Sequence, residues 1–135
     1  MTTNLDRMHA IDLAWNERRW EDYGALLDDR LVAYMAGDEC EHDKVRHLEK
    51  ARAFCAAHPD ARVIADRYLD LFESRDGTRT CSIARLVGTA GLSGKPVERR
   101  SFDVTFTVVC EWQDGRVVRQ REYLDNVTLA RQLGG

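Results

Sequence analysis

Apolar residues near the amino terminus recur every three or four positions, which places them on one face of a helix. The residues that follow this spacing are Leu5, Met8, Ile11 and Trp15. Thr3 or Asn4 stands where an N-cap is expected, and Asp6 lies in the first turn. After a break near Arg18-Arg19, Tyr23 and Leu27 lie four apart. The pattern therefore predicts two helices in the first 27 residues.

The next segments change type twice. Residues 31–36 form a short apolar run that ends at Gly37-Asp38, which is typical of a strand. Helical spacing returns at Val45, Leu48, Ala51 and Cys55, and His58-Pro59 ends it. A strand and a third helix are expected here.

From Ala61 onward the hydrophobic period changes to two, which predicts a sheet in the second half of the chain. Asp76-Gly77 and Asp114-Gly115 lie between strand-like runs and supply the positive φ of tight hairpin turns. Gly91, Gly94 and Pro96 predict a third hairpin connection.

The clearest strand alternates strictly between apolar and mostly polar positions. Its predicted buried face carries Phe102, Val104, Phe106, Val108, Cys110 and Trp112. A strand with one buried face and one solvent-exposed face is typical of an antiparallel sheet. We therefore expect an α+β fold, in which a curved, mostly antiparallel sheet wraps around three N-terminal helices. The twist of long strands curls such a sheet into a cone, and a cavity forms at its wide end.

Length, composition and charge bear on the number of domains and on whether the protein binds nucleic acid or membrane. With 135 residues, 44% of them hydrophobic, the chain makes one domain, residues 1–135. Twenty Lys and Arg against 23 Asp and Glu leave no basic surface for nucleic acid. No apolar stretch is long enough to span a membrane, and the amino terminus does not resemble a signal peptide. These observations predict a soluble, cytoplasmic protein that binds neither nucleic acid nor membrane.

Metal ligation is not expected from the cysteines and histidines. The four cysteines form no CxxC pair, and we interpret them as free and mostly buried thiols. The nearest approach to a metal motif is Cys40-Glu41-His42-Asp43 followed by His47. His42 and His47 lie five residues apart, which on one helix would point them about 140° apart. We interpret both as solvated helix residues.

Several local strings, in this order, resemble the SnoaL-like polyketide cyclase branch of the nuclear-transport-factor-2-like superfamily, which includes ketosteroid isomerase. The strings are Trp15-Asn16 with Trp20 and Tyr23, Val45-Arg46-His47-Leu48, residues 59–63, Gly115-Arg116-Val117-Val118, Tyr123-Leu124-Asp125 and residues 129–134. The resemblance implies a conical α+β barrel with a short C-terminal helix. It also implies a homodimer, and acid/base chemistry without metal or organic cofactor.

The resemblance assigns the role of general acid/base to Asp125, at the end of the last strand. By strand alternation, Asp125 shares a face with Tyr123, Arg121, Arg119 and Val117. If that face is concave, a carboxylate lies beside a phenol and guanidinium groups. The alternative is that Asp125 caps the final helix, or pairs with Arg121 or Arg85.

Other side chains are candidates for contact with a small hydrophobic or aromatic ligand. The predicted substrate-binding residues are Trp15, Trp20, Tyr23, Tyr34, Arg85, Phe106, Arg121 and Tyr123. For the aromatic residues the alternative is core packing. Arg85 lies between Ile83 and Val87 on an apolar strand face, so it needs a carboxylate or an anionic ligand, unless it is solvated at an edge.

Three functions are open from the sequence. The first is an enzyme in which Asp125 moves a proton on a carbonyl-rich, polyketide-like substrate, with Tyr34, Tyr123 or Arg85 stabilising the enolate. The second is a non-catalytic binder, and the third is a dimerising scaffold whose cone is filled by its own side chains. Val109 is an apolar residue on the otherwise polar, solvent-exposed face of its strand, which favours a homodimer through the outer face of the sheet.

Overall fold

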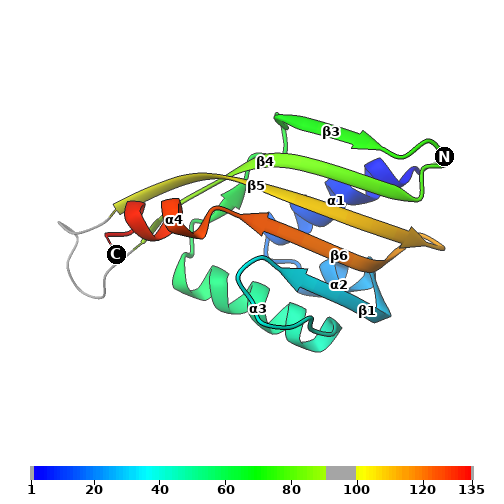
Figure 1. Ribbon diagram of the computed structural model, residues 1–135, viewed down its shortest axis with the longest axis horizontal. Coiled ribbons are helices and arrows are strands. Elements are labelled where there is room, and N and C mark those ends of the chain that lie inside the picture. Colours follow the sequence, from blue (N-terminus) through cyan, green and yellow to red (C-terminus); the bar gives the residue numbers. More distant parts are fainter. Residues whose placement is uncertain (1, 91–99, 135) are drawn as a thin grey trace.

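Four helices and six strands follow one another along residues 2–90 and 100–134, which this computed structural model describes (Figure 1). The helices are α1 (Asn4–Asn16), α2 (Trp20–Ala25), α3 (Lys44–Ala57) and α4 (Asn126–Gln132). The strands are β1 (Leu27–Met35), β2 (Arg62–Val63), β3 (Asp70–Glu73), β4 (Arg79–Ala90), β5 (Arg100–Gln113) and β6 (Arg116–Leu124). The α+β class predicted from the two hydrophobic periods is confirmed.

Local sequence explains where the N-terminal helices begin and end. Thr3 and Asp6 form a capping box at the start of α1, in which each side chain accepts a hydrogen bond from the other's backbone N–H. Arg18 adopts a positive φ of 58°, which separates α1 from α2. Asp43 caps α3 by accepting the Arg46 N–H at 2.9 Å.

The six strands form one curved, open sheet in the order β1-β6-β5-β4-β2, with β3 also paired to β4. β4 and β5 are antiparallel from Arg79↔Glu111 to Ala90↔Arg100. β1 pairs with β6 in parallel and the other strand pairs are antiparallel, so the expected mostly antiparallel sheet is confirmed. β1 is separated from β6 along the chain by α3 and four other strands, and no hairpin constrains its direction.

Two of the predicted hairpin turns are confirmed. Gly77 has a φ of 73°, while Asp114 and Gly115 have φ values of 52° and 77°. The third predicted turn, with Gly91, Gly94 and Pro96, lies outside the described residues.

The concave face of the sheet is covered by α1, α2 and α3, which lie behind and below the strands in Figure 1. The predicted inner positions of β5 are buried, apart from the partly exposed Phe106. Two hydrophobic clusters form beneath the helices, and both are contacted by Trp15 and Phe106. The space between these clusters is where the candidate site lies.

Strand β6 contains an irregularity that decides which of its side chains face inward. Trp112 of β5 pairs with Val117, whereas the preceding Glu111 pairs with Arg119, so Val118 is an extra residue. Val117 and Gln120, three positions apart, are both buried on the inner side. The expectation that Asp125 shares one face with Val117 is therefore wrong, because the bulge reverses the alternation.

Among the described residues, no helix combines the length and the apolar character needed to cross a bilayer.

Candidate functional site

A cavity of about 450 Å³ lies between the concave face of the sheet and the helices. One part of its wall is apolar and includes Trp15, Phe54, Val63, Leu86, Phe106 and Leu124. The interior wall also carries the hydrogen-bonding side chains of Asp12, Tyr23, His47, Ser82, Gln120 and Glu122. An apolar chamber with a few convergent polar groups is typical of a small-molecule site.

Asp12 brings a buried carboxyl to this cavity from α1, where its side chain lies on the face packed against the sheet. The residue is 8% exposed. Tyr68, in the segment before β3, donates a 2.6 Å hydrogen bond from its hydroxyl to Asp12 Oδ2. Burial raises the pKa of Asp12 to about 7, the Tyr68 hydrogen bond opposes the rise, and the charge of Glu122 adds to it. Asp12 is therefore present in both protonation states near neutral pH.

Glu122 supplies the second carboxyl from β6. Its side chain is 20% exposed, and it lines the cavity. Removal from bulk water raises its pKa, while a hydrogen bond donated by the Gln120 amide opposes that rise. The cavity therefore holds two carboxyls, on opposite layers of the fold, that both resist ionisation.

His47, on α3, lies beside Glu122 and is 3% exposed. Its Nε2 lies 3.1 Å from the Tyr23 hydroxyl, 3.4 Å from Gln120 Nε2 and 3.7 Å from Glu122 Oε1. Burial and, to a smaller extent, the charge of Lys50 lower the pKa of His47 to about 4. His47 is a neutral imidazole at neutral pH, so it does not form a charged pair with Glu122.

The cavity opens along α3, because the exposed residues Arg46 and Ala53 belong to its wall. Lys50 also lines the opening and forms an ion pair with Asp38 at 3.1 Å. Arg46 forms an ion pair with Glu49, on the same helix. The rim of the cavity thus carries charged side chains, whereas its interior is largely apolar and contains the titratable carboxyls of Asp12 and Glu122.

Three of the predicted ligand-contacting residues, Trp15, Tyr23 and Phe106, line the cavity. Trp20 instead packs on the core, with its ring edge against Tyr23 at 5.7 Å between centroids. Whether any of these residues touches a ligand stays a prediction.

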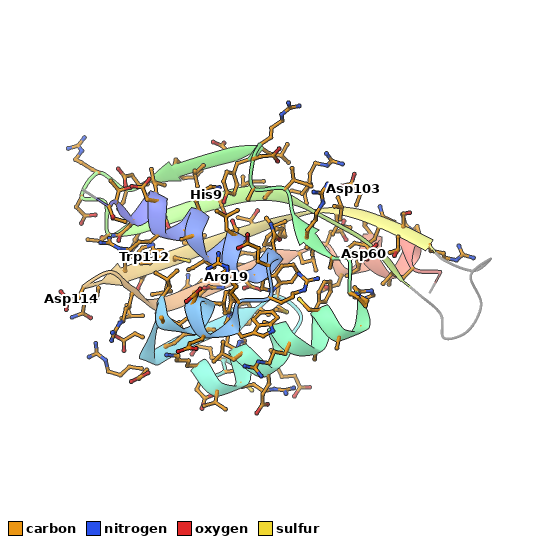
Figure 2. The ribbon with its side chains drawn as sticks, turned by 180° about the vertical axis from the view of Figure 1, so that it is seen from behind. His9, Arg19, Asp60, Asp103, Trp112 and Asp114 are labelled. Carbon is orange, nitrogen blue, oxygen red and sulfur yellow. The ribbon has the colours of Figure 1, made fainter. Side chains whose placement is uncertain are left out.

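The other predicted contacts lie outside the cavity. Tyr34 and Tyr123 pack edge to face at 6.4 Å, and Tyr123 is 44% exposed. Arg121 is exposed on the outer face of β6. Arg85 is exposed as well and forms an ion pair with Asp103. Asp103 lies near the start of β5, and Trp112 lies near the other end of the same strand (Figure 2). Arg85 thus has a carboxylate partner, Asp103, and is also solvated, although β4 is not an edge strand of the sheet.

Asp125, the predicted acid/base residue, is exposed and does not line the cavity. Its Oδ1 accepts the Thr128 backbone N–H at 2.9 Å, and its Oδ2 accepts the Thr128 hydroxyl at 2.6 Å. These hydrogen bonds lower the pKa of Asp125. Asp125 is the N-cap of α4, which is the alternative that the sequence left open.

The interpretation of His42 and His47 as solvated helix residues is wrong. α3 begins at Lys44, so His42 lies before the helix, and a hydrogen-bonded bridge to Ala33 of β1 holds its backbone. The two imidazoles stack at 5.2 Å between centroids, and His42 Nε2 lies 2.9 Å from His47 Nδ1. The angle expected from five helical positions does not apply, because only one of the residues is helical.

Sequence reasoning missed Asp12, Glu122 and His47 as site residues. For two of them a signal was present. Met8, Ile11, Asp12 and Trp15 follow the i, i+3, i+4, i+7 spacing of a buried helix face, so Asp12 occupies a core position. His47 likewise precedes Ala51 and Cys55 at intervals of four. A titratable residue at such a position needs a partner or a function.

Within residues 2–90 and 100–134, no group of three His, Cys, Asp or Glu side chains is placed to hold a metal ion.

The curved sheet around three helices and the interior cavity define a cone fold of the nuclear-transport-factor-2-like superfamily. The model of the SnoaL-like polyketide cyclase family matches residues 6–133, and the chain belongs to that family. A search of curated proteins gave no significant match.

Solved structures with the same fold cover nearly the whole chain. IdmH of Streptomyces antibioticus, a candidate polyketide cyclase, is 24% identical with a TM-score of 0.84, over 99% of this chain and 100% of that one. A SnoaL-like polyketide cyclase of Agrobacterium tumefaciens is 20% identical with a TM-score of 0.77, again over 99% and 100%. A phenazine biosynthesis-related protein of Pseudomonas aeruginosa is 16% identical with a TM-score of 0.72, over 97% and 87%. At these identities the likeness shows the fold alone.

Proposed function

We propose that the protein is an enzyme that binds a hydrophobic, carbonyl-bearing small molecule in its cavity and cyclises or isomerises it by acid/base chemistry. Membership of the SnoaL-like polyketide cyclase family supports a polyketide-like substrate. The observation that carries the proposal is the pair of carboxyls, Asp12 and Glu122, in an apolar chamber of about 450 Å³. A carboxyl whose pKa lies near the operating pH is effective both as acid and as base.

In the proposed reaction Asp12 acts as the base and Glu122 acts as the acid. Asp12, ionised in part at neutral pH and oriented by Tyr68, removes a proton from the carbon α to a substrate carbonyl. In the reacting form of the enzyme, in which Asp12 is ionised and Glu122 protonated, Glu122, whose pKa is raised by burial, donates its proton to that carbonyl oxygen. The substrate is then a neutral enol, Asp12 is protonated and Glu122 is ionised.

Cyclisation or isomerisation completes the exchange. In cyclisation the enol carbon attacks a second carbonyl, Glu122 takes back the enol proton, and the new alkoxide takes the proton from Asp12. In isomerisation Asp12 returns its proton to a different carbon and Glu122 again takes back the enol proton. Both routes leave the two carboxyls as they began, so no cofactor is required.

The open cavity argues against the scaffold alternative, because a scaffold filled by its own side chains would leave no such chamber. A non-catalytic binder would use the same apolar wall. The difference between binder and enzyme lies in whether Asp12 and Glu122 move protons.

Proton exchange at a model ketone tests the proposal before the natural substrate is known. The probe is 2-tetralone in D₂O, and the measurement is deuterium incorporation at its α-carbon by NMR. The protein should accelerate exchange, and Asp12→Asn should reduce the acceleration on the order of 10²-fold, because an amide cannot accept the proton. Asp125→Asn is the matched control and should exchange at the wild-type rate. If 2-tetralone binds without accelerated exchange, the binder alternative is favoured.

A further inference from the structure

Some of the hydrogen-bonding side chains in the interior wall of the cavity are already bonded to one another. The His47 imidazole contacts the Tyr23 hydroxyl at 3.1 Å and the Gln120 amide nitrogen at 3.4 Å. The Gln120 amide also donates to Glu122 Oε1, and Gln120 Oε1 lies 3.8 Å from Cys110 Sγ. The protein itself therefore occupies the polar groups of Tyr23, His47 and Gln120.

Three other side chains of the wall each leave one oxygen without a partner among the described residues. Asp12 accepts the Tyr68 hydroxyl at Oδ2, which leaves Oδ1 open. Glu122 accepts the Gln120 amide at Oε1, which leaves Oε2 open. The third open oxygen is the hydroxyl of Ser82, on β4. The proposed function uses the two carboxyls but assigns nothing to this hydroxyl.

The Ser82 hydroxyl is hidden from bulk water but open to the cavity. Ser82 is 2% exposed. Within residues 2–90 and 100–134, His42 Nδ1 is the one fully covered side-chain polar atom that lacks a hydrogen bond. Ser82 Oγ has no hydrogen bond there either, so it keeps some accessible surface, and Ser82 lines the cavity. A buried hydroxyl without a partner costs free energy, which a ligand oxygen placed against it would recover.

Thr80 shows how the same strand accommodates a hydroxyl that serves the fold. Thr80 lies two positions before Ser82 and is 1% exposed. Its Oγ1 accepts a 2.8 Å hydrogen bond from the indole N–H of Trp112. Thr80 does not belong to the wall of the cavity. On β4, the hydroxyl inside the core is thus paired, whereas the hydroxyl at the cavity is open.

The sheet places Ser82 and Glu122 at the two ends of one row across three strands. Ser82 of β4 pairs with Val108 of β5, and Val108 pairs with Glu122 of β6. Paired residues point to the same face, and all three line the cavity. Neighbouring strands lie about 4.8 Å apart, so the two ends of the row are separated by about 10 Å at the backbone. The row is therefore polar at both ends and apolar in the middle, over a span comparable with the length of two fused six-membered rings.

We propose that Ser82 binds a second oxygen of the substrate, at the end of the molecule remote from the carbonyl that Glu122 protonates. The substrate is then a molecule of about the length of two fused rings that carries a hydroxyl or carbonyl oxygen at each end. This inference rests on the proposed function, which places the reacting carbonyl at Glu122. A serine hydroxyl can donate to a carbonyl, and it can donate to or accept from a hydroxyl. Ser82 takes no part in the proton transfers and acts as a specificity-determining residue.

Binding of three related ketones to two serine variants tests the assignment. 2-Tetralone carries its one oxygen at one end, whereas 6-hydroxy-2-tetralone and 7-hydroxy-2-tetralone carry a second oxygen on the other ring. The Kd of each ligand is measured by calorimetry for the wild-type protein, Ser82→Ala and Ser101→Ala. Ser101, on β5, is exposed and lies outside the wall of the cavity, so Ser101→Ala is the matched control.

Ser82→Ala should weaken the binding of at least one of the two hydroxy-tetralones. Its Kd should rise about three- to tenfold, which is the range expected for one neutral hydrogen bond. The Kd of 2-tetralone should change less than about twofold, because that ligand has no oxygen for Ser82 to bind. Ser101→Ala should bind all three ligands as the wild type does. Because the Ser82 hydroxyl has no partner in the protein, Ser82→Ala should melt no more than about 2 °C below wild type.

Three results would overturn the assignment of Ser82. In the first, Ser82→Ala changes the Kd of all three ligands by the same factor, which would indicate a general effect on packing. In the second, Ser82→Ala lowers Tm by more than about 2 °C, which would indicate that the hydroxyl is bonded within the fold. In the third, the wild-type protein binds neither hydroxy-tetralone, so no two-ring ligand spans the row.

None of these measurements requires proton transfer, so they separate the role of Ser82 from the proposed function. Accelerated deuterium exchange in 2-tetralone, together with hydroxy-tetralone binding that does not depend on Ser82, would remove the Ser82 assignment and leave the proposed chemistry. Hydroxy-tetralone binding that depends on Ser82, without accelerated exchange, would support Ser82 as a ligand contact and contradict the proposed chemistry.

Discussion

Glu122 Oε1 lies 3.7 Å from His47 Nε2, and burial shifts the pKa values of these two residues in opposite directions. The pKa of the carboxyl rises, whereas the pKa of the imidazole falls to about 4. When the pair holds a single proton, that proton resides on Glu122 and not on His47, so the two groups do not form an ion pair. Environments that separate the pKa values of neighbouring groups are typical of acid/base sites.

Replacing Asp12 by Asn should stabilise the protein at alkaline pH. The folded-state pKa of about 7 lies above the ordinary 3.8, so the folded state binds more protons between these values. The contribution of Asp12 to stability is present in full below pH 3.8 and is lost as pH rises to about 7. Asp12→Asn should therefore raise Tm at pH 8 by about 5 °C or more, and by much less at pH 4. Calorimetry of both proteins across this range is the measurement, and an equal shift at both pH values would contradict it.

The opposite dependence is expected for His47. Its folded-state pKa of about 4 lies below the ordinary 6.5, so the unfolded state binds more protons between these values. The contribution of His47 is present above pH 6.5 and is lost as pH falls to about 4. Urea unfolding of His47→Gln should show a smaller loss of stability between pH 6.5 and 4.5 than wild type. A loss as steep as that of wild type would show that His47 is not a buried neutral imidazole.

Access to the cavity can be blocked from its rim. Ala53 is exposed and lines the opening, so Ala53→Trp should fill the entrance without disturbing the core. We expect the Kd for 2-tetralone to rise at least tenfold, with Tm changed by no more than about 2 °C. Ala56→Trp is the matched control, because Ala56 is exposed on the same helix but does not line the cavity. Equal binding by both variants would place the entrance elsewhere.

The homodimer expected from the sequence is tested at the outer face of the sheet. Phe72 is 50% exposed and pairs with Cys81, and Val109 pairs with Cys81 from the other side. Paired residues point to the same face, so these side chains form an apolar outer surface. We expect a dimer by light scattering at micromolar concentration, and Phe72→Glu should dissociate it. Val45→Glu, at an exposed apolar residue on α3, is the control that should remain dimeric. A monomeric wild-type protein would overturn the expectation.

Much of the fold follows from the sequence because each element carries its own local signal. The capping box at Thr3, the turn at Asp114-Gly115 and the alternation of β5 are all properties of residues close together in the chain. The parallel pairing of β1 with β6 is not such a property. It depends on which sheet edge is free after the hairpins have formed, and local patterns do not encode that edge.

The site was harder to predict, and Asp125 shows why. Strand alternation counted back from Asp125 places Val117 on the same face, but the extra residue Val118 reverses the count. A bulge leaves no mark in a strand as polar as β6, because Arg119, Gln120, Arg121 and Glu122 fit either face equally well. In α1, by contrast, the position of Asp12 on the apolar face could be found by counting alone.

The proposed function requires that the cavity carboxyls, and not Asp125, carry the proton chemistry, and a titration of each carboxyl tests this requirement most directly. Side-chain ¹³C resonances of Asp12, Glu122 and Asp125 would be followed by NMR from pH 3 to pH 9, with Asp12→Asn, Glu122→Gln and Asp125→Asn used for assignment. We expect a pKa of about 7 for Asp12, a pKa above the ordinary 4.5 for Glu122, and a pKa below the ordinary 3.8 for Asp125. Titration of Asp12 and Glu122 at or below their ordinary values would contradict it.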